Sequence, residues 1–168
     1  LLLNPWEMTW GRVRSSDVIR IDLDGNLLEG NHSVTPGVQL HLALHRIRPD
    51  VRVVVHHHPE WALVWSAIGE VPEIFDQTGA LVRDDRVSFH DEYRGTVADQ
   101  AIASENVAGI GDGDAVLLAN HGLLVTADSV ERAFVRSMSL EWRCKVAWRV
   151  KATGATGRPI PADVALAL

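Results

Sequence analysis

The sequence predicts an α/β domain in which helices cover a sheet. Short β-branched and apolar runs, such as residues 51–55, alternate along the chain with longer segments whose apolar residues recur at helical spacing. The length of 168 residues, with 46% hydrophobic and 23% charged residues, suits one globular domain. We therefore expect residues 1–168 to form a single layered domain.

The first half of the chain is expected to hold two strands and two helices. In order, these are a strand at 18–23, a helix at 36–48, a strand at 51–55 and a helix at 59–65. Alternating apolar and polar residues indicate the first strand, and a β-branched run broken only by Arg52 indicates a buried second strand. Pro36 and Pro59 suit the first turn of a helix, where a backbone N–H is not needed.

The second half is expected to add three strands and two helices. In order, these are a strand at 87–89, a helix at 97–107, strands at 115–119 and 123–125, and a long helix at 129–151. Asp128 is the expected N-cap of the last helix, because Glu131 stands at capping-box spacing. The tail after Gly154 is rich in glycine, proline and alanine and is expected to be a loop.

Charge and cysteine content exclude several classes of protein. The formal net charge of -6 argues against a nucleic-acid-binding module, which usually carries a basic face. The single cysteine, Cys144, excludes an intrachain disulfide and a cysteine-based structural zinc site. No apolar run reaches the ~18 residues that a membrane helix needs, and no signal peptide is evident. The sequence thus predicts a cytoplasmic protein without nucleic-acid or membrane partners, and the lack of a first Met suggests a missing N-terminal segment.

The histidines point to a metal site. Three of the eight histidines are consecutive, and at a strand end His56 and His58 project to one side while His57 points to the other. His121 follows another predicted buried strand in a glycine turn, so it can add a third imidazole. Three protein ligands leave positions open on a divalent ion, as in catalytic sites. From spacing alone, hydrogen-bonded polar histidines are an equally good interpretation.

A second histidine pair, His41 and His45, stands at i, i+4 on a predicted helix. The metalloprotease pattern requires a glutamate directly after the first histidine, and this sequence has Leu42 there. The pair therefore favours packing over metal binding. Trp6 and Trp10, near the N-terminus, are expected to line a pocket or an interface.

Two blocks of the sequence resemble the class II aldolase/adducin family. The first block spans residues 36–59 and includes HLAL at 41–44, RPDV at 48–51 and VVHHHP at 54–59. The second is LLANHGLLV at 117–125, ahead of the predicted long helix, and YRGT at 93–96 lies between the blocks at a fitting distance. The resemblance covers residues 4–150.

This resemblance implies a fold, a cofactor and an activity. The implied fold is a three-layer α/β/α sandwich with a mainly antiparallel central sheet, assembled into homo-oligomers, commonly cyclic tetramers. The implied cofactor is one divalent metal, zinc first and Mn or Fe(II) as alternatives, on the positions of His56, His58 and His121. The implied activity is that of a lyase, which cleaves a small hydroxylated or oxo acid by aldol-type cleavage or decarboxylation while the metal stabilises negative charge.

The sequence departs from the sugar-phosphate aldolases of this family at the helix start. Those enzymes place a catalytic glutamate four residues before the position of His41, where this sequence has Gly37, and Pro36 replaces a serine that often holds phosphate. Because a positioned acid or base contributes about 10²–10⁴-fold, we expect different chemistry on a substrate that is not a phosphosugar. Glu92 and Tyr93, in a loop near the family's active-site region, are the candidate proton donors.

Two alternatives stay open at this stage. A non-heme Fe(II) oxygenase with the same three ligands would consume oxygen. An adducin-like interaction domain would bind no metal, and the presence of all three histidines argues against it.

Overall fold

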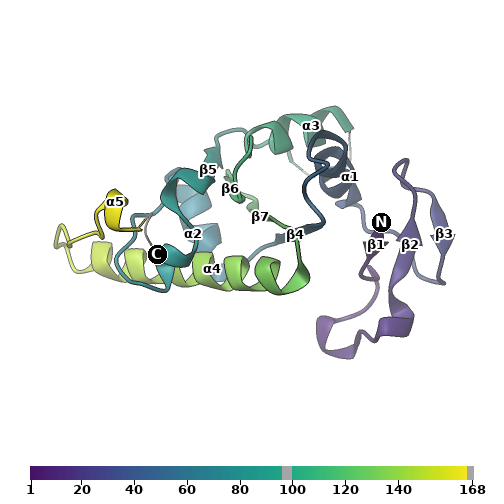
Figure 1. The fold of residues 1–168 in the computed structure, drawn as a ribbon, viewed down its shortest axis with the longest axis horizontal. Helices are drawn as coiled ribbons and strands as arrows, with labels where there is room; N and C mark the ends of the chain where they lie inside the picture. The colour runs from purple at the N-terminus through teal and green to yellow at the C-terminus, as the bar shows by residue number, and fades with distance from the viewer. Residues whose placement is uncertain (96–99, 166–168) are drawn as a thin grey trace.

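The computed structural model describes residues 1–95 and 100–165, which form an α/β fold (Figure 1). The strands form two sheets. The small N-terminal sheet is antiparallel with the order β1 (Leu2–Leu3), β2 (Ile19–Ile21), β3 (Leu27–Glu29). The main sheet has the order β4 (Val53–His57), β7 (Gly122–Ala127), β6 (Ala115–Leu118), β5 (Val87–His90).

Five α-helices accompany these strands in the described residues. They are α1 (Val38–Ile47), α2 (Glu60–Ile68), α3 (Gln100–Ala108), α4 (Val130–Ala152) and α5 (Ala162–Ala165). Single turns of 3-10 helix cover Trp10–Arg12, Ser15–Asp17, Gly79–Leu81 and Asp84–Arg86. Within the described residues, none of the helices combines the length and the apolar character that a bilayer span requires.

The main sheet is mixed. β7 pairs antiparallel with both β4 and β6, whereas β5 joins parallel to β6. The prediction of an α/β domain is confirmed. The two antiparallel pairings bring the end of β4 beside the start of β7, where His56 lies opposite Leu124 in register.

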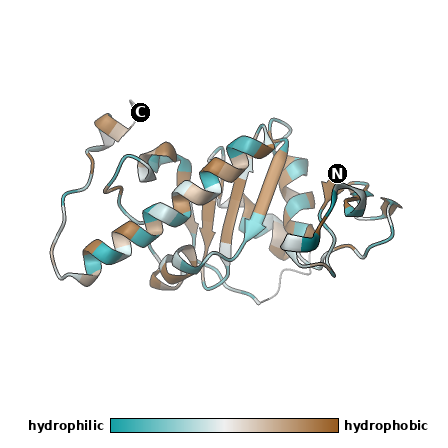
Figure 2. Cartoon of the chain, turned by 90° about the horizontal axis from the view of Figure 1, so that it is seen from below, coloured by the Kyte–Doolittle hydropathy of each residue, from teal (hydrophilic) through white to brown (hydrophobic). Residues whose placement is uncertain are grey.

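Helices cover both faces of the main sheet, and this explains its apolar sequence. On one face Val116, Leu118 and Leu124 pack with residues of α1 and α3. On the other face Leu117 and Leu123 pack with residues of α2 and α4. Figure 2 shows the hydrophobic strands behind the long helix α4. Because successive strand residues point to opposite faces, two apolar faces require the nearly continuous apolar runs of β6 and β7.

Several expected boundaries need correction. β4 begins two residues later than predicted and continues into the histidines. It is half-buried rather than buried because, among the described strands, β7 alone pairs with it. The N-cap of α4 is Ser129, whose hydroxyl accepts the Arg132 backbone N–H at 3.2 Å. Asp128 instead pairs with the Arg132 side chain at 3.2 Å, so the predicted cap is wrong by one residue.

Other elements of the structure were not predicted from the sequence. β1, β3 and the short α5 were not expected, and α5 interrupts the predicted C-terminal loop. The start predicted for the helix at 97–107 lies outside the described residues, and the described part of this helix begins at Gln100.

Candidate metal centre

Strand alternation places His56 and His58 together. His56 lies in β4 and His58 directly after its last residue, so both rings project to the same side. Their Nε2 atoms are 3.2 Å apart, and their ring centres are 4.9 Å apart. His57 projects differently, and its buried Nε2 has no hydrogen-bond partner among the described residues.

The hairpin between β6 and β7 supplies the third ring. His121 lies 4.8 Å from His56 and 5.1 Å from His58 between ring centres. The turn is tight: Asn120 has a positive φ of 52°, and the His121 N–H donates to the Leu118 carbonyl at 3.0 Å. One ligand nitrogen from each of His56, His58 and His121 lies within 4.8 Å of the others. We call these three residues the histidine cluster.

Gly122 is needed for this close approach. A Cβ atom at this position would lie 2.5 Å from Cδ2 of His58 and 2.8 Å from the His57 carbonyl oxygen. Both distances are shorter than Cβ contacts allow, so a side chain at Gly122 would require the His58 ring or the His57 backbone to shift. The glycine expected to shape the turn thus also makes room for one of the rings.

The environment disfavours protonation of two rings of the cluster, those of His56 and His121. Burial, followed by repulsion from His121 and His58, lowers the pKa of His56 to about 3. Burial and the proximity of His58 also lower the pKa of His121. Nδ1 of His56 lies 3.2 Å from the Leu123 carbonyl oxygen, and a proton on Nδ1 leaves the Nε2 lone pair free to face the cluster. Neutral imidazoles with free lone pairs are the donors that a divalent metal requires.

A cavity of about 340 Å³ opens beside His56 and His58. Its remaining walls come from His57, from α1 and the residues just before it, with Thr35, Gly37 and His41, and from the N-terminal segment, with Asn4, Pro5, Trp6, Met8 and Trp10. Within the described residues, its lining includes no lysine, arginine, aspartate or glutamate. The cavity thus offers aromatic, amide and hydroxyl groups but no fixed charge.

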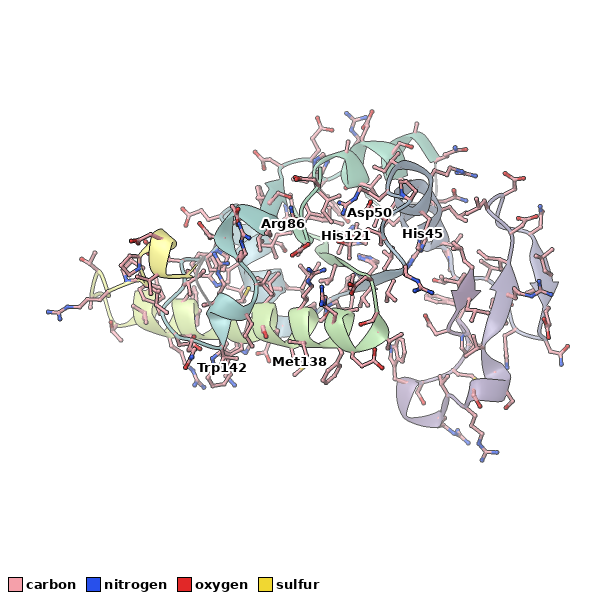
Figure 3. All side chains as sticks on the ribbon, in the orientation of Figure 1. His45, Asp50, Arg86, His121, Met138 and Trp142 are labelled. Carbon is pink, nitrogen blue, oxygen red and sulfur yellow. The ribbon has the colours of Figure 1, made fainter. Side chains whose placement is uncertain are left out.

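His41 is a site residue that sequence reasoning missed. The i, i+4 pattern favoured a packing role, yet His41 lines the cavity from α1. Burial, with a smaller contribution from His45, lowers the pKa of His41 to about 4, so this ring is neutral at pH 7. His45 lies one turn further along α1 and outside the histidine cluster (Figure 3). The sequence did contain a signal for the position of His41. Gly37 and His41 are one helical turn apart, so they lie on the same side of the helix.

Glu92 and Tyr93 do not reach this cavity. The Glu92 carboxylate pairs with Arg94 at 2.8 Å, and Arg94 also contacts Glu105 at 2.9 Å. Tyr93 is 57% exposed. Neither residue lines the cavity, so their role as proton donors stays a prediction. Trp6 and Trp10 do line the cavity.

Three imidazoles at the ends of neighbouring strands, two of which (His56 and His58) line a cavity, form a site that can hold a metal and leave coordination positions free. The chain belongs to the family of the class II aldolase and adducin N-terminal domain, whose model matches residues 1–148. This is the family that the two histidine blocks resemble, and class II aldolases are metal-dependent.

Named relatives differ in activity. The chain is 31% identical over 145 residues to adducin-related protein C1289.14 of Schizosaccharomyces pombe, covering 79% of the chain and 42% of the relative. It is 26% identical over 153 residues to the 5-deoxy-D-ribulose 1-phosphate aldolase of Bacillus thuringiensis serovar kurstaki, covering 90% and 70%. It is 31% identical over 167 residues to the 3,4-dihydroxyphthalate decarboxylase of Arthrobacter keyseri, covering 94% and 66%.

A solved structure shares the fold. The crystal structure of an aldolase II superfamily protein from Pseudomonas syringae superposes with a TM-score of 0.84 at 26% identity, covering 99% of this chain and 68% of that one. For the three relatives named above, the matched region of this chain spans between 42% and 70% of the length of the relative.

Proposed function

We propose that this domain is a metal-dependent lyase that decarboxylates a hydroxylated carboxylic acid. His56, His58 and His121 hold one divalent ion, with zinc as the first candidate and Mn or Fe(II) as alternatives. The observation that carries the proposal is the geometry of the histidine cluster, in which three ligand nitrogens lie within 4.8 Å of one another beside a cavity. Imidazole donors of this kind suit zinc and iron.

The donor set fits the proposed metal. A protonated cluster would repel a cation, but the pKa of His56 is lowered to about 3, so its ring is neutral at pH 7. When bound, the metal supplies Lewis-acid stabilisation of the negative charge left on the substrate as carbon dioxide departs. The Leu123 carbonyl orients the His56 ring, and Gly122 leaves room for His58.

The cavity walls favour decarboxylation over aldol cleavage of a sugar phosphate. Gly37 supplies no acid or base, and no arginine or lysine among the described residues lines the cavity to bind a phosphate. Trp6 and Trp10 offer flat apolar surfaces for an aromatic ring. The relative named 3,4-dihydroxyphthalate decarboxylase supports the same substrate class.

Decarboxylation needs only one proton from the protein. The bond between the carboxyl carbon and its neighbour breaks, and its electron pair stays on that neighbour, which then accepts a proton. Glu92 and Tyr93 are the proposed proton donors, which requires their loop to approach the cavity once substrate is bound. The packing of α1 and α3 on one sheet face and of α2 and α4 on the other supports the three-layer sandwich that the family resemblance implies.

Metal content and carbon dioxide release test the proposal together. We expect about one divalent ion per chain after reconstitution with zinc, and loss of this ion in His56→Ala, His58→Ala and His121→Ala. His45→Ala is the matched control, because His45 lies outside the cluster and should leave the metal bound. Carbon dioxide release from 3,4-dihydroxyphthalate, the substrate named for one relative, should follow metal content, and dihydroxyacetone phosphate should not compete. A wild-type chain that binds no zinc, manganese or iron would refute the proposal.

A further inference from the structure

The His41 ring is largely buried, yet it has no bonding partner in the fold. It lines the cavity beside the histidine cluster from α1, and it forms no hydrogen bond or ion pair with any residue of the described ranges 1–95 and 100–165. His41 lies outside the histidine cluster, so it is not a proposed metal ligand. Because buried polar groups usually have a hydrogen-bond partner, an unpartnered ring beside a cavity indicates that a ligand supplies this partner.

The helix that carries His41 is firmly packed. Leu40 and Leu44 of α1 are fully buried in the core of the main sheet, and Leu42 packs against the small N-terminal sheet. Helical side chains lean toward the N-terminal end of their helix, so the His41 ring lies over the turn that begins at Gly37. A ligand would therefore meet a ring that is already positioned, which lowers the entropic cost of binding.

The cavity has open space beside this ring because residue 37 is a glycine. Outside its neighbours in the chain, a Cβ atom on Gly37 would meet only the Thr35 hydroxyl oxygen, at 4.0 Å. The backbone does not require glycine here, since the φ of −75° is one that any residue adopts. The missing side chain thus leaves room for a small substituent of a ligand next to His41.

The His41 ring can donate a hydrogen bond without adding a charge. Burial, with a smaller contribution from His45, lowers its pKa to about 4, so at pH 7 the ring carries one N–H and one lone pair. No lysine or arginine among the described residues lines the cavity. A carboxylate that leaves as carbon dioxide gives up its negative charge in the transition state, so a cation beside it would stabilise the ground state more than the transition state. A neutral donor avoids this penalty.

We infer that His41 and Gly37 form the subsite for the carboxylate that the substrate loses, an inference that rests on the proposed decarboxylation. The His41 N–H donates to one carboxylate oxygen, and the group occupies the space beside Gly37. The bond from the carboxyl carbon to the ring then breaks, its electron pair stays on the ring carbon, which takes up a proton, and carbon dioxide leaves. The substrate class is therefore an aromatic acid that carries hydroxyl groups for the metal in addition to the carboxylate that departs.

Two ligands that differ in this one substituent test the subsite. In 3,4-dihydroxy-2-nitrobenzoate a nitro group, which has two acceptor oxygens and cannot leave as carbon dioxide, replaces the 2-carboxylate of 3,4-dihydroxyphthalate. In 3,4-dihydroxybenzoate the same ring position carries only hydrogen. We expect His41→Leu to bind the nitro ligand about fivefold more weakly than the wild type does, because one hydrogen bond is lost, and to bind 3,4-dihydroxybenzoate unchanged. Calorimetric titration of the zinc-loaded protein measures both affinities.

Three further variants sharpen this test. His45→Leu is the matched control, because it makes the same substitution one turn further along α1, at a residue that does not line the cavity. His41→Gln keeps an N–H donor and should recover part of the lost affinity. Gly37→Leu fills the open space and should weaken binding of the nitro ligand more than binding of 3,4-dihydroxybenzoate. Zinc affinity should stay unchanged in every variant, since none of these residues belongs to the histidine cluster.

Kinetics with 3,4-dihydroxyphthalate give a second readout. The hydrogen bond from His41 forms in the ground state, so His41→Leu should raise KM about fivefold and change kcat by less than about twofold. A residue that only supported the fold would not separate KM from kcat in this way.

The outcomes separate this inference from the proposed function. A selective loss of the nitro ligand in His41→Leu, with partial recovery in His41→Gln and none of this loss in His45→Leu, supports the subsite. Equal weakening of both ligands, or unchanged binding of both, overturns it. Carbon dioxide release by the wild type would in that case leave the proposed lyase standing, whereas a wild-type chain that takes up no divalent metal would refute both.

Discussion

The two ends of the β6–β7 hairpin carry polar clusters of opposite character. At one end, the histidine cluster gathers three imidazole rings beside a cavity. At the other end, charged residues form an arginine–aspartate cluster, which comprises Arg48, Arg86, Arg132, Arg136, Asp50, Asp112, Asp114 and Asp128. Asp114, directly before β6, accepts ion pairs from Arg86 at 3.0 Å and Arg136 at 2.8 Å.

The difference between these clusters distinguishes a structural ion-pair network from a candidate ligand site. Each arginine of the arginine–aspartate cluster has an aspartate partner, so the charges satisfy one another and stabilise the local fold. Among the described residues, the rings of the histidine cluster contact one another and the Leu123 carbonyl oxygen. Ring nitrogens gathered in this way form an arrangement that a divalent metal ion can bind.

The largest expected effect is on metal affinity. His121→Ala removes one of three nitrogen ligands, and we expect zinc affinity to fall by more than about 100-fold, beyond the loss typical of residues that only support a ligand. Asp114→Asn is the comparison at the other end of the hairpin and should leave zinc affinity unchanged. Calorimetric titration of metal-free protein with zinc measures both variants. Equal zinc affinity in His121→Ala and wild type would place the metal elsewhere.

Asp114→Asn should instead lower the free energy of unfolding. The Asp114 side chain is 15% exposed and its two arginine partners 18–27%, so the substitution leaves two partly buried guanidinium groups beside each other. Burial already lowers the pKa of Arg136, which shows that its charge is costly there. We expect a loss of about 2 kcal/mol, measured by urea denaturation. A loss below the error of that measurement would show that solvent screens this network as it does surface pairs.

The third expected effect concerns the pH dependence of folding stability. Burial lowers the pKa of His41 to about 4, below the ~6.5 of an unfolded histidine, so between these values the unfolded chain binds more protons. The stability that His41 contributes is full above pH 6.5 and is lost as the pH falls from 6.5 toward 4.

His41→Gln removes this proton uptake. Between pH 6.5 and 5, we expect the slope of unfolding free energy against pH to decrease by up to about 1.4 kcal/mol per pH unit. Urea denaturation of the metal-free protein at several pH values gives the slope. Identical slopes for the variant and the wild type would contradict the buried, neutral state of His41.

The smallest effect belongs to the exposed edge of the arginine–aspartate cluster. Asp128 and Arg132 form an i, i+4 pair at 3.2 Å, and both side chains are more than half exposed. Asp128→Asn should change the free energy of unfolding by less than about 0.5 kcal/mol. Ser129→Ala, which removes the actual N-cap, should cost about 1 kcal/mol. Thermal or urea denaturation measures both variants. A larger loss of stability in Asp128→Asn than in Ser129→Ala would indicate that Asp128, and not Ser129, is the N-cap.

Local sequence patterns predicted that the three histidines gather, because strand periodicity places two of them on one side and a tight turn holds the third. His56 and His58 share a side through the two-residue period of a strand, and the Asn120–His121–Gly122 turn places the third ring at the neighbouring strand end. This prediction did not need the exact register of β4 and β7, because both histidine blocks lie at the ends of strands that pair with each other.

The rest of the site depends on distant segments, which sequence patterns do not specify. Trp10 and Gly37 meet at one cavity because the N-terminal segment returns beside α1, and no periodicity signals that return. The ion pair between Arg86 and Asp114 joins residues 28 positions apart and has no local pattern either. The parallel pairing of β5 with β6 and the shift of the cap from Asp128 to Ser129 were likewise decided by tertiary packing and side-chain geometry.

Anomalous scattering from crystals of the zinc-loaded chain tests the central claim most directly. The account predicts one strong peak at the zinc edge, about 2.0–2.1 Å from a ring nitrogen of each of His56, His58 and His121. The ring of His45, outside the cluster, should show no such peak. Zinc bound at other residues, or three histidines that hold no metal at full zinc saturation, would contradict the account.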